Sequence, residues 1–141
     1  MKNWSLALLL ACAAYVVSVT ASAQLKEAGL YSTKLTGEVV VGKEGNLELR
    51  ILPAKGYKWN KDYPAKITLP NSKLVQFKKS VLKARDGDIK AEKTSGLATM
   101  TCTGTTTGTE TLTAEASFSV CSEETCQVLR KRKVSLSVVV K

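Results

Sequence analysis

The chain has 141 residues, carries 21 lysines and arginines against 12 acidic residues, and contains no histidine. The lack of histidine excludes histidine general bases, Ser-His-Asp and Cys-His nucleophile systems and histidine metal sites, and most hydrolases with them. The formal charge of +9 favours acidic partners or anionic surfaces without deciding the fold. We expect no metal and no cofactor, so cysteine is the reactive side chain that remains.

Residues 1–23 fit an export signal peptide. A single lysine precedes an apolar run, and Ala21-Ser22-Ala23 supplies a cleavage site made of small residues. Two alternatives stay open. A membrane anchor would need a longer and more apolar run than this one. A lipoprotein signal would lipidate Cys12 after Leu9-Leu10-Ala11, which would make the signal unusually short.

The rest of the chain is long enough for one domain with a single core. We expect residues 24–34 to form a lead-in segment and residues 35–141 to form the domain. No second apolar stretch is long enough to cross a bilayer, so no transmembrane segment is predicted in the mature chain.

Short alternating runs follow the lead-in. Leu47–Ile51 alternates as a half-buried strand does, and Pro53 ends it because proline has no backbone donor. A glycine-bounded turn predicts that this strand forms a hairpin with residues 38–41. The next loop holds three aromatic residues, which either cap the core or form a ligand surface, for example for sugars. These are Tyr57, Trp59 and Tyr63.

The middle of the chain is less regular. Alternation at Ile67 and Leu69 and again over 74–77 predicts two more short strands, separated by Pro70. Residues 78–96 are charged and are expected to form a connection with a turn at Arg85–Asp88.

The C-terminal third has the strongest strand pattern. Residues 98–103, 110–120 and 134–140 alternate apolar with polar side chains and are rich in threonine and valine. The turn at Gly104–Gly108 predicts a hairpin between the first two runs. Several short strands with regular turns indicate an all-β domain, a two-layer β-sandwich.

Cys121 and Cys126 flank a short polar loop at the end of one alternating run. Two strands joined by such a loop bring their ends within disulfide reach. Exported chains meet an oxidising compartment, so we expect the pair to be bonded. The bond is either a structural staple or a redox pair. A loop this small gives a staple of only about 2 kcal/mol, while its exposure makes exchange possible.

Cys102 shares a strand face with Ala98 and Met100, which predicts a buried free thiol. The densest positive run is Arg130-Lys131-Arg132-Lys133. It either lowers the pKa of a nearby thiol or docks an acidic partner, or it is a solvated edge that discourages aggregation. Glu123 and Glu124, between the paired cysteines, either assist proton transfer or are simply exposed.

The segment Phe118-Ser119-Val120-Cys121-Ser122-Glu123-Glu124-Thr125-Cys126, followed by a valine-rich last run, resembles the redox loop of a known family. This family is the periplasmic N-terminal domain of the thiol:disulfide interchange protein DsbD. Gly56-Tyr57-Lys58-Trp59-Asn60 with the later Pro64 is similar to a glycine–aromatic segment of the same domains. The resemblance implies an immunoglobulin-like sandwich, standing alone without the membrane domain, in which Cys121 and Cys126 alternate between dithiol and disulfide.

Two functions are therefore expected. The first is an exported thiol–disulfide exchange domain, periplasmic or secreted, whose partners are thioredoxin-like or membrane thiol-disulfide proteins of the periplasm. The second is a non-enzymatic binding or structural sandwich in which the same disulfide is inert. Nucleic acid is not an expected partner, because an exported chain without stacking aromatics near its basic run lacks the usual features.

Overall fold

The computed structural model describes residues 29–141. The predicted signal peptide, Cys12 and the first part of the lead-in lie outside the described residues. The described chain forms ten strands and one 3₁₀ turn, η1 (Ala84–Asp86). The strands are β1 (Tyr31–Thr36), β2 (Glu44–Pro53), β3 (Lys58–Trp59), β4 (Lys66–Thr68), β5 (Val75–Phe77), β6 (Val81–Lys83), β7 (Ile89–Glu92), β8 (Ser95–Gly104), β9 (Gly108–Cys121) and β10 (Cys126–Val140).

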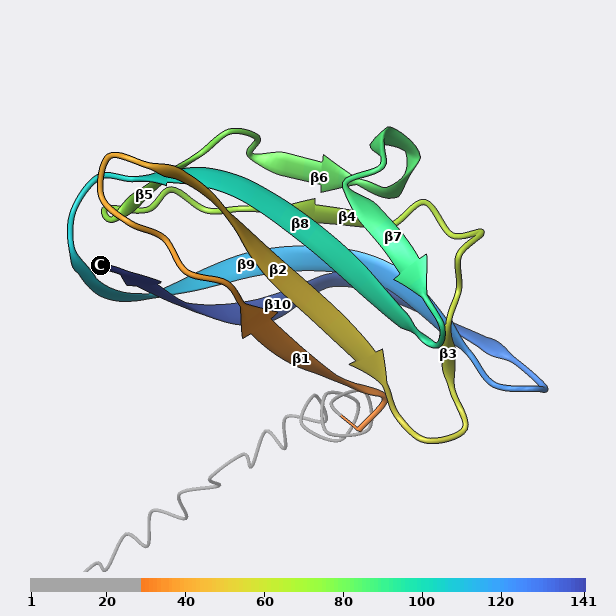
Figure 1. Cartoon of the computed structure of the whole chain (residues 1–141). Helices are drawn as coiled ribbons and strands as arrows, with labels where there is room; N and C mark the ends of the chain where they lie inside the picture. The colour runs from red at the N-terminus through yellow and green to blue at the C-terminus, as the bar shows by residue number, and fades with distance from the viewer. Residues whose placement is uncertain (1–28) are drawn as a thin grey trace, which may run out of the picture.

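The strands form two antiparallel sheets that face each other (Figure 1). The first sheet has the order β1-β2-β8, with β5 and β7 paired to different parts of the far side of β8. The second has the order β10-β9-β4-β6, with β3 also paired to β9. These orders correspond to the A-B-E-D and G-F-C arrangement of immunoglobulin domains. The predicted all-β, immunoglobulin-like sandwich is confirmed.

The core lies between the two sheets and follows the alternation of the strands. Buried side chains alternate with more exposed ones over residues 97–104, 112–118 and 134–140 of β8, β9 and β10, as predicted from the three C-terminal runs. Among the largest fully buried side chains are Phe118, Leu49, Ile67 and Leu136. Fully burying one such side chain contributes about 1.5–3 kcal/mol, so the core is the main source of stability.

The N-terminal part differs from the prediction. The first strand begins at Tyr31, inside the expected lead-in, and it is β1 that pairs with β2. The predicted hairpin between residues 38–41 and β2 is wrong. Gly37 has a φ of 117°, and a Cβ there would lie 2.5 Å from the carbonyl oxygen of Asn46. The glycine therefore lets the chain leave the first sheet, and Val39 makes a parallel bridge to Val140 in the second.

Two further connections differ from the prediction. Residues 78–96 hold β6 and β7 on either side of η1, so the expected irregular connection contains two short strands. The predicted hairpin between residues 98–103 and 110–120 is also wrong, because β8 and β9 belong to different sheets. The turn after Gly104 crosses from one sheet to the other. Alternation identifies buried faces but does not say which strands are neighbours.

In residues 29–141, no helix has the length and apolar character needed to cross a bilayer.

Candidate functional site

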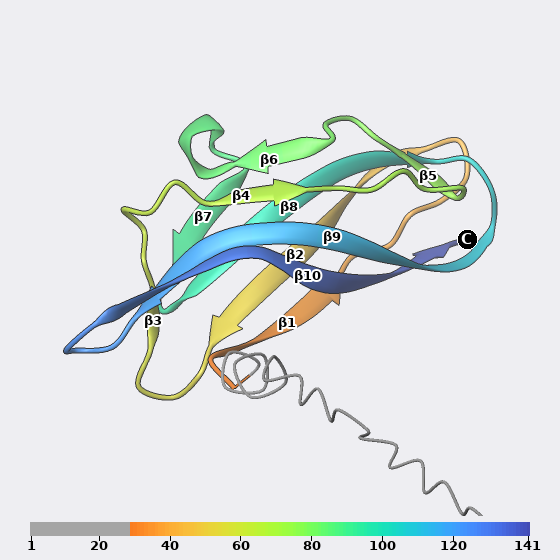
Figure 2. The ribbon, with the colours of Figure 1, turned by 180° about the vertical axis from the view of Figure 1, so that it is seen from behind.

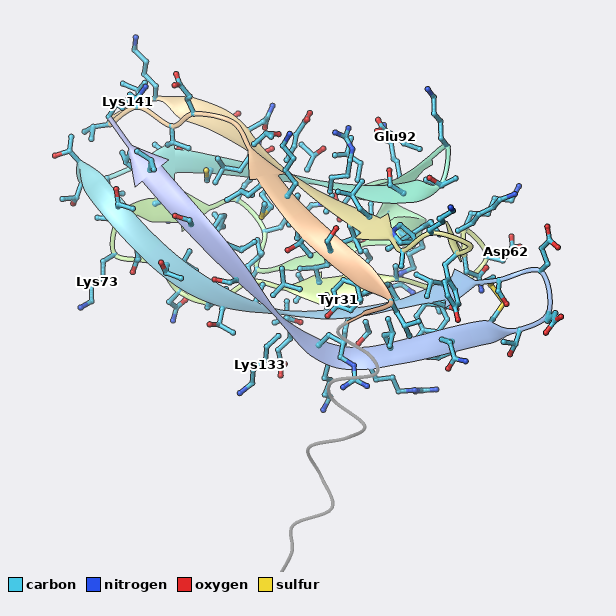
Figure 3. The ribbon with its side chains drawn as sticks, turned by 90° about the horizontal axis from the view of Figure 1, so that it is seen from below. Tyr31, Asp62, Lys73, Glu92, Lys133 and Lys141 are labelled. Carbon is cyan, nitrogen blue, oxygen red and sulfur yellow. A yellow bond between two sulfur atoms is a disulfide. The ribbon has the colours of Figure 1, made fainter. Side chains whose placement is uncertain are left out.

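The candidate site lies at the tip of the hairpin formed by β9 and β10. Cys121 is the last residue of β9, Cys126 is the first of β10, and the two stand opposite each other in the strand register. Their sulfur atoms are bonded at 2.04 Å and their Cα atoms are 4.0 Å apart. The bond is drawn in yellow at this end of the molecule in Figure 3. The predicted pairing is confirmed, and the bond closes the mouth of the hairpin as expected.

The loop between the two cysteines is held by Ser122. Its backbone N–H donates to the Thr125 carbonyl at 2.8 Å. Its hydroxyl donates to the same carbonyl at 3.2 Å and accepts from the N–H groups of Glu124 and Thr125. Glu123 and Glu124 are exposed at the tip and make no ion pair with other described residues. The loop conformation therefore has support that does not depend on the disulfide.

The two cysteines differ in exposure. Cys126 is exposed, whereas Cys121 is half-buried because β3 lies along its other side. A partner therefore has easier access to the Cys126 end of the bond than to the Cys121 end.

Strand β3 brings the second segment of the family resemblance to the same place. Lys58 pairs with Cys121 and Trp59 pairs with Val120. Directly opposite residues of neighbouring strands project from the same face of a sheet, with Cβ atoms about 4.5–5.5 Å apart. Lys58 is exposed and stands on the face that carries Cys121. The sequence interpretation gave Lys58 no role, although the aromatic segment that contains it was noted.

The next residue, Trp59, caps the core. Its ring is stacked on Phe118 with centroids 5.4 Å apart and planes at 12°, and Tyr31 meets Phe118 edge-on at 4.9 Å. On the other side, a Cβ on Gly96 would lie 2.6 Å from the indole, so only glycine leaves room for the ring. Trp59 is 9% exposed, and Tyr57 and Tyr63 pack partly buried against the core. The capping interpretation of these aromatics is the one the geometry supports.

Asn60 joins this cap to the hairpin. Its backbone N–H donates to the Ser119 carbonyl at 2.9 Å, and its side-chain amide donates to the buried Ser119 hydroxyl at 3.3 Å. The cysteine hairpin therefore rests on a packed and hydrogen-bonded base.

The basic run of residues 130–133 lies further along β10. The strand register shifts between Leu129 and Arg132, where a β-bulge places Lys131 at a φ of 48°. The Lys131 N–H donates to the Ser117 hydroxyl at 3.0 Å. Arg130 is four residues from Cys126, or roughly 13 Å at the rise of a strand. That exceeds the screening length of about 8 Å in physiological salt. Lys58 is therefore the cation better placed to act on the cysteine pair.

Cys102 is the free cysteine of the described chain and lies buried in the middle of β8. It is 1% exposed, and burial raises the pKa of its thiol. The predicted buried free thiol is confirmed, and it lies in a different sheet from the bonded pair.

Within residues 29–141, no group of three or more histidine, cysteine, aspartate or glutamate side chains is arranged to hold a metal ion.

The sequence matches no protein-family model and no curated protein. Among solved structures, the chain is similar to a cohesin module from a family 33 glycoside hydrolase of Clostridium perfringens ATCC13124. The TM-score is 0.39 and the identity is 18%, over 79% of this chain and 97% of that one.

Proposed function

We propose that the chain is an exported thiol–disulfide exchange domain whose redox pair is Cys121 and Cys126. The observation that carries the proposal is the placement of the bond. It joins facing residues at the tip of a hairpin, one of them exposed, on a base that is already packed by Trp59 and Phe118. A bond closing so small a loop adds only about 2 kcal/mol of stability.

The exchange proceeds in two displacement steps. A partner thiolate attacks Sγ of Cys126, the S–S bond breaks, and Cys121 leaves as a thiolate. A second partner thiolate then attacks the partner sulfur of the mixed disulfide and releases Cys126 as a thiolate. The partner dithiol is oxidised to a disulfide, and the domain gains two electrons and, after proton uptake, becomes the dithiol. The reverse sequence transfers electrons outward.

Lys58 supports the first step. Its ammonium group belongs to the sheet face that carries the leaving sulfur, and a nearby positive charge favours the thiolate form and so speeds departure. Ser122 contributes by keeping the loop closed while the bond is broken, because its hydrogen bonds remain. The Cys102 thiol takes no part, since it is buried in the other sheet.

The partners would be thioredoxin-like or membrane thiol-disulfide proteins that meet the domain in the periplasm or after secretion. A disulfide is compatible with an oxidising compartment outside the cytoplasm. The predicted signal peptide supports export as well.

A second function has one observation in its favour. The hydrogen bonds of Ser122 and the packing of β3 make the hairpin tip an ordered structure, as a structural staple requires. In that case the domain would be a binding or structural sandwich with an inert bond.

The equilibrium reduction potential of Cys121–Cys126 separates the two functions. Purified mature domain carrying Cys102→Ala would be equilibrated in glutathione redox buffers and its thiols counted by mass after alkylation. A potential above about −250 mV is expected for exchange, and one below about −300 mV would establish the staple. A Lys58→Gln variant should exchange more slowly with a thioredoxin-like dithiol, whereas Lys34→Gln on β1 should not.

A further inference from the structure

The outer face of the second sheet carries a row of cations that crosses four strands. In β4 and β6, Lys66 stands directly opposite Lys83. On its other side Lys66 stands opposite Ser117 of β9. Ser117 in turn faces the bulge of β10, where its hydroxyl accepts from the Lys131 N–H. These four strands lie side by side toward the viewer in Figure 2.

The alternation of each strand sets the direction of these side chains. Ile67, Leu82 and Ala116 are buried in the core. Their neighbours in sequence must therefore point to the outer face. Lys66 is exposed and Lys83 is half-buried there, and Arg130 and Lys131 are exposed at the bulge. We call Lys66, Lys83, Arg130 and Lys131 the basic row. It spans three strand spacings, roughly 14 Å.

Contacts within the domain leave the basic row largely uncompensated. Within residues 29–141, none of its four cations takes part in an ion pair. Arg85, next to the row, is paired with Asp86, with 3.6 Å between Nε of the arginine and Oδ1 of the aspartate. The strand acid on the same face is Glu115, two residues before Ser117 and opposite Lys133 in the register. The Asp88 carboxylate accepts from the Lys83 backbone N–H at 3.2 Å, but its ion pair is with Lys79. Like charges directly opposite each other in a sheet are destabilising, so stability does not explain why Lys66 faces Lys83.

A shallow hollow marks one end of the row. Its volume is about 180 Å³, and it is lined by Pro64, Ala65, Lys66, Lys83 and Arg85. The surface of the hollow is almost entirely apolar, so it is lined by the stems of Lys66, Lys83 and Arg85 and not by their charged ends. The charged ends of these three side chains suit sulfate or carboxylate groups on the surface around the hollow, because hydrogen bonds between ionised partners are the strong ones.

We propose that the basic row binds a linear acidic polysaccharide, which lies across β6, β4, β9 and β10 with its anionic groups on the charged ends of the row. The charges are aligned in one direction, as a linear polyanion requires. An exported domain with a strongly basic balance meets such polymers outside the cytoplasm. This site is separate from the disulfide and does not depend on its redox activity.

Two other anionic ligands fit the row less well. Single-stranded nucleic acid is bound with aromatic platforms for base stacking, and the outward positions of these strands carry none. A bilayer would favour exposed apolar side chains that enter it. The exposed large apolar residues of the described chain are Val40, Val41, Val128 and Val139. Two of them lie on β10 outside the row, and none lies on β4, β6 or β9.

The test compares two variants of the mature domain with the same net charge. The first carries Lys66→Gln, Lys83→Gln and Lys131→Asn, the last because asparagine tolerates a positive φ. The control carries Lys34→Gln, Lys55→Gln and Lys90→Gln, which are exposed lysines of other surfaces. Binding is measured by titration calorimetry with heparin as a sulfated probe and polygalacturonate as a carboxylated probe, at several salt concentrations. Vesicles of phosphatidylglycerol serve as the bilayer probe.

The basic-row variant should bind at least one of the two polysaccharides about tenfold or more weakly than wild type, with a flatter salt dependence, because fewer counterions are released. The control should bind within about twofold of wild type. The midpoint of thermal unfolding of the basic-row variant should equal or exceed that of wild type, since it removes a like-charge pair. If both variants lost the same affinity for the polysaccharide, net charge alone would explain binding, and the proposal would be overturned. Absence of polysaccharide binding by the wild type, or binding to vesicles alone, would overturn it as well.

Discussion

The buried thiol of Cys102 and the bonded pair at the hairpin tip are two extremes of cysteine environment within one sandwich. Cys102 is 1% exposed in the middle of β8, and burial raises its pKa. Cys126 is exposed and bonded to Cys121 at the end of β9. The thiolate is the reactive form of cysteine, and burial disfavours it at Cys102. Cys126, by contrast, is accessible to another thiol. The fold therefore places its disulfide at an exposed tip and its free thiol in the core, and we expect the core to be stable without the disulfide.

The largest expected effect is the loss of stability when the core beneath the hairpin is truncated at Phe118. Phe118 is 1% exposed and contacts both Trp59 and Tyr31 beneath the hairpin. Phe118→Ala should lower the free energy of unfolding by about 3–5 kcal/mol, because it leaves a cavity and loses two aromatic contacts. Urea unfolding of the mature domain would measure it. The control Thr113→Ala, at an exposed position of the same strand, should change stability by less than about 0.5 kcal/mol.

A middle-sized effect is expected when the bond itself is removed. The double variant Cys121→Ala/Cys126→Ala should remain folded and lose about 2 kcal/mol, the chain-entropy contribution of a loop this short. Its unfolding would be compared with that of Phe118→Ala under the same conditions. If the double variant lost more unfolding free energy than Phe118→Ala, the hairpin base would depend on the disulfide. That result would contradict the difference drawn between the two cysteine sites. A matched variant, Ser122→Ala, keeps the bond and removes only the hydroxyl contacts of the loop.

These sites were predictable from the sequence to different degrees, for a physical reason. Local patterns were sufficient for the cysteine hairpin and for the buried face that holds Cys102, because alternation and a short loop fix both. The partner of β2 and the sheet change after β8 were not predictable, since they depend on which strands become neighbours. For the same reason the position of Lys58 opposite Cys121 was missed. Its pairing joins residues far apart in the chain.

The smallest expected effect sharpens the comparison through pH. Because burial raises the pKa of Cys102, its thiol stays protonated in the folded state when the unfolded thiol ionises, near the ordinary value of about 8.5. Below that pH both states hold the proton and the thiol has no effect. Above it the unfolded state binds fewer protons, so stability falls as pH rises, by at most about 1.4 kcal/mol per pH unit until the folded thiol also ionises. The bonded cysteines do not titrate.

The difference in unfolding free energy between wild type and Cys102→Ala, measured by urea titration at pH 7, 8, 9 and 9.5, isolates this contribution. All other side chains are the same in the two proteins, so their contributions to the pH dependence cancel. We expect a constant difference up to about pH 8 and then a decline that favours Cys102→Ala. A difference independent of pH would mean that Cys102 ionises as readily in the folded chain as in the unfolded one. Burial would then not be what separates the two cysteine sites, and access to the hairpin tip alone would have to account for their different chemistry.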